Sequence, residues 1–212
     1  MAKTLTQLMA ALGDWLNLDT TELPDSVRTD IINLTKRTIM RKNDLRFGEH
    51  SDTFATVVDQ QPYALPTGWS KPHSLWYTDP VTTNPVFLIK KEKDELDDLF
   101  PDLTDTDLPT HYAIWGSNIL LGKVPDQIVT INRNFYRVLP DYVTTSLESD
   151  AFNNEAWEVL LFNSFALAEQ YGIEDERISN WVALGKQMLD DLVFEHERSK
   201  GAGYVNQAQE PG

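Results

Sequence analysis

Leucines and one tryptophan recur at three- and four-residue spacing near the start of the chain, which is typical of a helix with one buried face. They are Leu5, Leu8, Leu12, Trp15 and Leu16, and they predict a helix over about residues 3–18. From Phe47 this spacing is lost and turn residues become frequent, and from Phe152 it returns. The pattern therefore predicts helices at both ends of the chain and short strands between them.

A second helix is predicted over about residues 24–42, because Pro24 suits a first helical turn, where its missing N–H costs no hydrogen bond. Its expected inner face consists of residues at helical spacing: Val27, Ile31, Leu34, Thr35 and Ile39. Four cations gather in its last two turns: Lys36, Arg37, Arg41 and Lys42. Cations near a helix C-terminus complement the helix dipole, so they indicate helix termination, with phosphate binding as the alternative.

Two further helices are predicted over about residues 152–171 and 175–198. The first is apolar on nearly every side, so we expect it to be buried between partners, and Gly172 follows it as a left-handed cap. The residues after 198 lack a core-forming pattern apart from Tyr204 and Val205, so residues 199–212 are predicted to form a flexible tail.

The central strand block spans about residues 53–137. Its expected strands are rich in β-branched and aromatic residues and lie near 54–58, 63–65, 75–77, 86–89, 111–115, 118–121 and 127–136. Gly116-Ser117 fits a two-residue hairpin with glycine first. A short helix precedes Pro101, and its apolar contacts are expected at Leu96, Leu99 and Phe100.

Consecutive short strands favour an antiparallel arrangement over a parallel βαβ sheet. We therefore predict an α+β fold, in which the N- and C-terminal helices form a bundle and the centre forms a small antiparallel sheet or barrel. The composition does not change along the chain, so residues 1–198 are expected to form a single domain, followed by the tail.

The chain has 212 residues, 41% of them hydrophobic, and no cysteine. The missing cysteines exclude disulfides, thiolate catalysis and cysteine-ligated metals. The start of the sequence lacks the continuous apolar run of a signal peptide, and no stretch approaches the ~20 apolar residues that span a bilayer. We expect a protein made in the cytoplasm, without a membrane partner.

The net charge of −15 argues against nucleic-acid binding, because a protein that neutralises phosphates needs a basic surface. Solubility is one reading of this charge. The other is a channel through which DNA slides without adhering.

No catalytic, cofactor-binding or metal-binding residues can be assigned. The sequence lacks phosphate-loop, dinucleotide-binding and nucleophile-elbow motifs. The histidines are widely separated, at positions 50, 73, 111 and 196. The acidic cluster of Asp94, Glu95, Asp97 and Asp98 points to different sides of a short helix, which favours a solvated face over a cation site. An enzyme is therefore the least favoured class.

Aromatic residues gather in the strand block, at Trp69, Trp76, Tyr77, Tyr112 and Trp115. Sheet core is their expected use, with a sugar-binding platform or a protein contact as alternatives. At the last strand, Arg133 and Arg137 could pair bidentately with carboxylates of a neighbouring copy. Together with Tyr136, they are the predicted subunit-interface residues.

The order of these elements resembles the head-to-tail adaptor (connector) proteins of tailed bacteriophages. The likeness covers residues 3–198 and rests on the terminal helices, the strand end at 63–66, the hairpin from Pro109 to Leu121, and the run from Val129 to Pro140. The resemblance implies a non-enzymatic virion protein that forms a ring, usually of twelve copies, beneath the portal. Such a ring contacts the next neck or tail component and extends the channel through which DNA passes. It also implies that Gly201–Gly212 dock on the portal, with Tyr204 and Val205 as apolar anchors.

Two other classes stay open. An acidic protein can mimic DNA and occupy a nucleic-acid-binding partner. A carbohydrate-binding module would line a groove with Trp69, Trp76 and Trp115.

Overall fold

The computed structural model describes residues 3–143, 150–169 and 177–205. They fall into two compact units: a helical unit, within residues 1–48 and 138–212, and a strand unit, Glu49–Arg137. The single domain predicted over residues 1–198 includes residues of both units. Composition does not mark the boundaries between the units, because each unit has an ordinary apolar core of its own.

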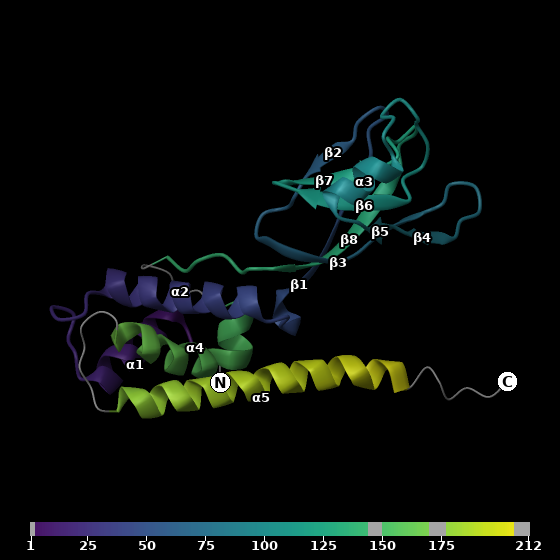
Figure 1. The fold of residues 1–212 in the computed structure, drawn as a ribbon. Coiled ribbons are helices and arrows are strands. Elements are labelled where there is room, and N and C mark those ends of the chain that lie inside the picture. The colour runs from purple at the N-terminus through teal and green to yellow at the C-terminus, as the bar shows by residue number, and fades with distance from the viewer. Residues whose placement is uncertain (1–2, 144–149, 170–176, 206–212) are drawn as a thin grey trace. The chain divides into compact units, whose positions relative to one another are not determined.

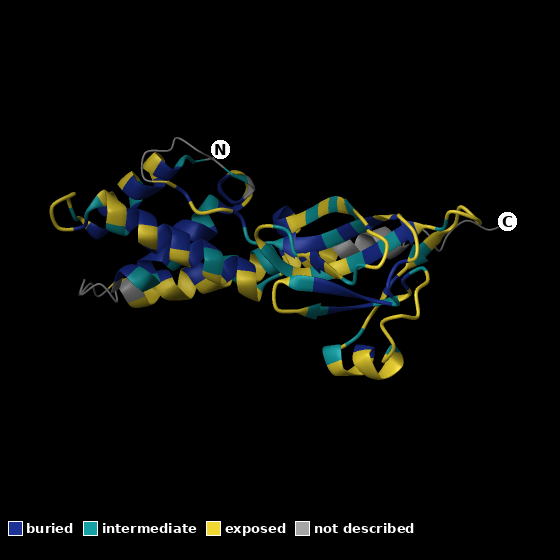
Figure 2. Cartoon of the chain, turned by 90° about the horizontal axis from the view of Figure 1, so that it is seen from above, coloured by how far each residue is buried: buried dark blue, intermediate teal, exposed yellow. Residues whose placement is uncertain are grey.

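The helical unit contains α1 (Leu5–Leu16), α2 (Asp25–Lys42), the 3-10 turn η1 (Arg46–Gly48), α4 (Ala151–Glu169) and α5 (Ile178–Val205). Helices α1, α2 and α5 all pack on α4, and α2 and α5 lie on opposite sides of it (Figure 1). Buried positions lie mainly along the inner sides of the packed helices, and exposed positions lie along their outer sides (Figure 2). The apolar surround of α4 is the physical reason that three helices gather on it.

Helix α1 begins with a capping box, in which Thr4 and Gln7 each accept the backbone N–H of the other. It ends at Asn17, whose φ of 55° is the left-handed conformation common at helix ends. The guanidinium of Arg28, on α2, then donates to the carbonyls of Leu23 and Leu18 at 2.8 and 2.9 Å. Arg28 thereby fixes the loop between the two helices.

The inner face of α2 differs from the predicted one. Leu34 was expected inside but is 47% exposed, whereas Lys36, one of the four cations in the last two turns, is 0% exposed. The buried stripe is centred on Ile32 and Lys36, and Leu34 lies about 200° around the helix from Ile32. Because a lysine lies at the centre of the buried stripe, the hydrophobic pattern of the sequence did not show which face of α2 is buried.

Helices α4 and α5 approach closely at Gly185, where a Cβ would lie 3.1 Å from the backbone N of Asn163. The Asn163 amide donates to the Gly185 carbonyl at 3.0 Å. Helix α5 continues past the expected end near residue 198 to Val205. The predicted cap Gly172 and the tail residues 206–212 lie outside the described residues.

The strand unit consists of two four-stranded sheets and one helix (Figure 1). Sheet A has the order β1 (Glu49–Ala55), β8 (Thr130–Arg137), β3 (Trp69–Thr78), β4 (Pro85–Phe87) and is antiparallel throughout. Sheet B has the order β2 (Pro62–Ala64), β7 (Asn118–Gly122), β6 (His111–Trp115), β5 (Ile89–Lys90), with β5 and β6 parallel. The last strand thus finds its partners in β1 and β3.

Residues from both sheets form the main core of the strand unit, including Leu75, Tyr112, Ile119, Leu121 and Ile131. Helix α3 (Lys93–Leu99) packs on β6 and buries Leu96 against Ala113 and Leu120 of sheet B. Two details correct the sequence analysis. The first strand ends at Ala55, leaving Val57 and Val58 exposed, and Leu99 is 51% exposed rather than packed.

The β6–β7 hairpin forms as its turn residues predict, with Trp115 opposite Asn118. Gly116 has a φ of +57°, a conformation that glycine adopts without a Cβ penalty. The predicted α+β class, with a helical bundle and a central antiparallel-rich block, is confirmed, and the block consists of two open sheets rather than a closed barrel. No helix in the described ranges is long and apolar enough to cross a membrane.

Candidate functional site

Strand β8 lies inside sheet A and carries the predicted interface residues. Arg133 points to the inner face, where its Nε and Nη2 donate to the two carboxylate oxygens of Asp52, both at 2.7 Å. Its Nη1 donates to the Ala64 carbonyl at 3.1 Å, and its guanidinium lies 4.8 Å from the centre of the Phe54 ring. The predicted bidentate partner is therefore present, but it belongs to the same chain. Arg133 ties β1 and β2 to β8.

Arg137 closes β8 opposite Trp69 of β3. Its Nε is buried and has no hydrogen-bond partner within the part of the chain that the structure describes. A buried N–H without a partner is costly, but this atom has almost no accessible surface, so an acceptor on another molecule cannot reach it in the present conformation. The assignment of Arg137 to a subunit interface stays a prediction.

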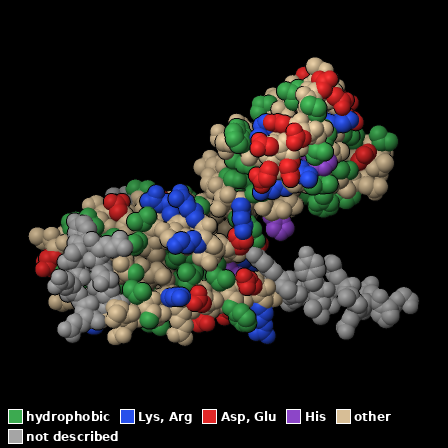
Figure 3. All heavy atoms as spheres, viewed as in Figure 1, with side chains coloured by type: hydrophobic (Ala, Val, Ile, Leu, Met, Phe, Trp, Pro, Cys, Tyr) green, Lys and Arg blue, Asp and Glu red, His purple; other side chains and the backbone are tan. Residues whose placement is uncertain are grey.

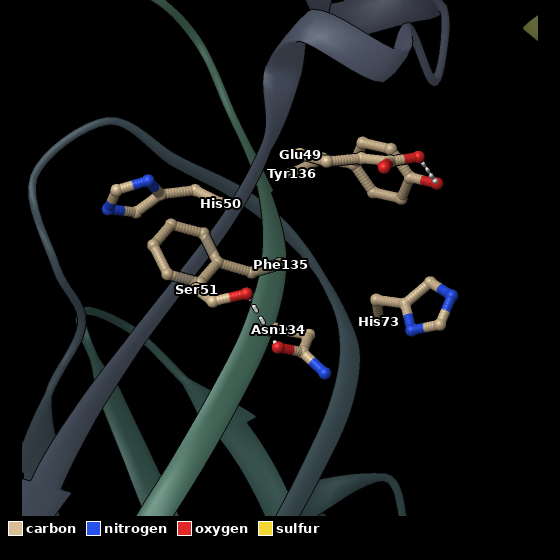
Figure 4. A pocket seen from close by; sticks show the side chains of 7 residues that line it. All are labelled: Glu49, His50, Ser51, His73, Asn134, Phe135 and Tyr136. Atoms are coloured by element: carbon tan, nitrogen blue, oxygen red, sulfur yellow. Dashed lines mark hydrogen bonds between the residues drawn. The ribbon is translucent and has the colours of Figure 1, made fainter.

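The third predicted interface residue, Tyr136, lines a pocket of about 400 Å³ on sheet A (Figure 4). Its hydroxyl hydrogen-bonds to the carboxylate of Glu49 at 3.4 Å, and the Ser51 hydroxyl hydrogen-bonds to the side-chain oxygen of Asn134 at 2.8 Å. Asn134 also donates to Ser74 at 3.0 Å. These contacts link β1, β8 and β3 across the polar face of the sheet.

Two histidines border the same pocket, and they lie on opposite sides of β8 (Figure 4). The His50 ring lies edge-on to the Phe135 ring, with the ring centroids 5.3 Å apart, whereas His73 lies on the Tyr136 side of β8. Among the described residues, no group of three histidine or carboxylate side chains could hold a metal ion. Ser51 has Asn134 rather than a histidine as its partner, so the pocket does not assemble a nucleophile with a base.

The three tryptophans of the sugar-binding alternative do not line one groove. Trp69 stacks on Phe135, with the ring centroids 4.7 Å apart. Trp76 pairs with Phe87 across β3 and β4, and Trp115 is 62% exposed on sheet B. The structure therefore gives the carbohydrate-binding alternative no platform.

A buried polar cluster, which the sequence analysis missed, lies in the helical unit. The ammonium of Lys36 donates to the Pro140 carbonyl and to Asp150, the latter at 3.1 Å, and lies 3.4 Å from the centre of the Tyr142 ring. The Tyr142 hydroxyl donates to Asp150 at 2.7 Å. Asn33 exchanges two hydrogen bonds with the Tyr142 backbone.

Burial, with a further contribution from Asp150, raises the pKa of Tyr142 and keeps the phenol neutral. The cluster fixes the irregular segment after β8 and the start of α4, where Asp150 also accepts the Asn153 backbone N–H. The cluster lies among buried residues of the core, so it has a structural role.

His196 makes a similar link between α5 and η1. It is 7% exposed, its Nδ1 accepts the Arg46 backbone N–H at 3.0 Å, and its ring meets Phe47 edge-on at 5.6 Å. The predicted tail anchors Tyr204 and Val205 lie at the end of α5.

The strand unit carries an acidic surface around α3 (Figure 3). The predicted cluster of Asp94, Glu95, Asp97 and Asp98 is exposed. Two of its members pair with lysines one turn away, Glu95 with Lys91 at 3.5 Å and Asp97 with Lys93. The cluster is thus a solvated face, as expected.

A family model, described as SU10 adaptor protein, matches residues 3–208. The chain belongs to the SU10 adaptor protein family. An adaptor of this family is a bacteriophage protein, a structural component of the virion that interacts with other head and tail components. Membership in a structural adaptor family implies a non-enzymatic role. No curated protein matches the chain significantly.

Proposed function

We propose that this adaptor assembles into a homo-oligomeric ring below the phage portal, a dodecamer by the resemblance, and extends the DNA channel toward the tail. The family match over residues 3–208 is the observation that carries the proposal. The ring would bind the portal on one side and the next neck or tail component on the other, while DNA passes without specific binding.

The charge distribution supports the passage of DNA. The net charge is −15, and the surface around α3 exposes carboxylates. A channel lined with carboxylates repels phosphates and releases no counterions from DNA. DNA would therefore not adhere to the channel wall during ejection.

Among the predicted contacts, Arg137 lies at the end of β8, opposite Trp69. Tyr136 borders the pocket on the same strand, while Arg133 already has its carboxylate in Asp52. Portal docking is assigned to the C-terminal residues, with Tyr204 and Val205 as the apolar anchors. Both lie at the end of α5, so the anchors would be presented by a helix.

Native mass spectrometry of the adaptor, alone and mixed with its portal, tests the proposal. We expect a ring-sized assembly in at least one of the two samples, and a truncation before Tyr204 should lose portal binding. A truncation before Asn206 is the matched control, because it keeps both anchors. A monomer that ignores the portal would contradict the proposal and favour the DNA-mimic alternative.

A further inference from the structure

A groove of about 360 Å³ runs between α4 and α5 in the helical unit. Val159, Met188 and Leu192 contribute its apolar lining. Its remaining residues are mostly carboxylates, of which Glu158, Asp191 and Glu195 have no ion pair among the described residues. A groove with an apolar floor and an acidic rim suits the apolar face of a basic helix.

The fourth carboxylate of the groove is already neutralised. Glu155 pairs with Arg46 of the same chain at 3.7 Å. This pair shows that a guanidinium can bind a carboxylate at the groove rim. The other three carboxylates repel one another and lose that repulsion when cations approach.

A surface with the opposite character lies on α2. Leu34, Thr38 and Arg41 are exposed and follow one another at helical spacing, and Lys42 lies one turn after Thr38. Leu34 is 47% exposed, and neither Arg41 nor Lys42 has an ion pair within the described chain. Figure 3 shows basic side chains gathered over this side of the helical unit. In a chain with 18 basic and 33 acidic residues, an apolar side chain flanked by open cations is a distinctive feature.

The dimensions of the two surfaces agree. From Leu34 to Lys42 the helix rises about 12 Å, and from Met188 to Glu195 it rises about 11 Å, at 1.5 Å per residue. Leu34 would enter the apolar lining while Arg41 and Lys42 reach the carboxylates. Helix dipole complementarity explains the cations alone but not the exposed leucine beside them.

The two surfaces cannot meet within one copy. Helices α2 and α5 pack on opposite sides of α4, so the basic face and the groove are separate surfaces (Figure 1). Two different, complementary surfaces on one chain form a heterologous contact, which closes into a ring when the rotation per copy permits.

We propose that the α4–α5 groove binds the Leu34–Lys42 face of α2 from a second copy of this chain. The inference rests on the proposed ring and adds the contact that joins neighbouring copies through their helical units. The contact is electrostatically steered, so its formation weakens as salt increases.

Charge reversal on each surface tests the contact. Variant one is Arg41→Glu with Lys42→Glu, and variant two is Asp191→Lys with Glu195→Lys. Each should weaken ring assembly on the order of 100-fold, because like charges then face each other. All four positions are solvent-exposed or at the groove rim, so thermal unfolding should stay close to that of the wild type.

Mixing the two variants provides the decisive sample. In an alternating ring, the reversed α2 of variant one meets the reversed groove of variant two, and the native α2 of variant two meets the native groove of variant one. Native mass spectrometry should therefore find rings in the mixture that neither variant forms alone. Two controls match the charge changes elsewhere: Lys90→Glu with Lys186→Glu, and Asp94→Lys with Asp98→Lys. Both should assemble normally.

Each contrary result has a distinct meaning. Wild-type-like assembly of both variants, or equal loss in the matched controls, would overturn the contact and leave the proposed ring standing. A mixture that fails to assemble would do the same. Rings that form normally but no longer bind the portal would assign the groove to the portal instead. A wild-type protein that never assembles, even with the portal, would overturn the ring itself.

Discussion

The two units keep their polar groups in different places. In the helical unit, charged or polar side chains are buried within the core, among them Arg28, Asn33, Lys36 and His196. In the strand unit, the buried polar side chains of the described chain are Thr56 and Arg133. The difference shows which backbone groups each architecture leaves unpaired.

Strands satisfy most of their backbone groups through the sheet ladders, so the core between sheets A and B can be almost entirely apolar. The helical unit must instead hold helix ends and an irregular segment, 138–143, whose carbonyls have no ladder. Lys36 reaches the Pro140 carbonyl, Arg28 reaches those of Leu18 and Leu23, and Asn33 pairs with the Tyr142 backbone. Buried polar side chains thus replace secondary structure where the chain has none.

The largest expected effect tests this difference in the helical unit. Lys36→Ala should lower the free energy of unfolding by about 3–5 kcal/mol, because it leaves Asp150 without its cation in the core. Denaturant unfolding measures the loss. The matched control, Lys42→Ala, removes an exposed lysine from the same helix and should change stability by under about 0.5 kcal/mol. Equal losses in the two variants would refute a role for the buried cluster.

A somewhat smaller loss is expected when the buried ion pair of the strand unit is broken. Arg133→Ala removes both hydrogen bonds to Asp52 and should cost about 3 kcal/mol. The loss should appear in hydrogen exchange of β1 and β8 and leave the helical unit unchanged. Arg137→Ala is the control on the same strand. If Arg133→Ala disturbs only assembly and not exchange, its function is intermolecular instead.

The pH dependence of the strand unit has a definite sign. Burial raises the pKa of Tyr112 to about 12 from 10.0, so the folded state holds this proton more tightly than the unfolded state. The resulting stability is complete below pH 10 and decreases as pH rises toward 12, by up to about 2 kcal/mol. Tyr112→Phe should flatten the stability profile of the strand unit in that window. A profile as steep as that of the wild type would show that other groups cause the loss.

The smallest effect concerns the β6–β7 turn. Gly116→Ala should cost about 1 kcal/mol, because an L-residue is strained at the φ of +57° while its Cβ meets no atom within 4 Å. Gly116→Asn should cost less, since asparagine tolerates this conformation. Thermal unfolding compares the two variants. A larger loss for Asn than for Ala would mean that contact, rather than backbone strain, determines this position.

Sequence patterns predicted those features that depend on local physics. The stripe of α1, the β6–β7 hairpin and the apolar sides of α4 follow from spacing and turn chemistry, which act over a few residues. The same reasoning failed at Leu34 and Lys36, because it treats every lysine as a surface residue. Partners distant in sequence, among them Asp150 and the Pro140 carbonyl, make this buried lysine stable.

The candidate site was less predictable than the fold. The sequence marked Arg133 as a residue that would pair with a carboxylate, but Asp52 is far away in sequence and faces it only through the β1–β8 register. The α4–α5 groove gave no sequence signal, because its carboxylates come from two helices separated by a connection. The open cations of α2 were visible in the sequence. The helix dipole gave a sufficient reason for them, so the exposure of the leucine beside them was not predicted.

The sequence alone determined the class of the protein: its α+β order of elements, its acidity, its lack of catalytic motifs and its likeness to phage adaptors. Those properties depend on composition and on short-range periodicity, which a single chain displays directly. The tertiary structure decided which charges are buried, which carboxylate neutralises Arg133, and which helix faces stay open for other molecules. These depend on burial and on contacts between distant residues, and they exist only once the two cores have formed.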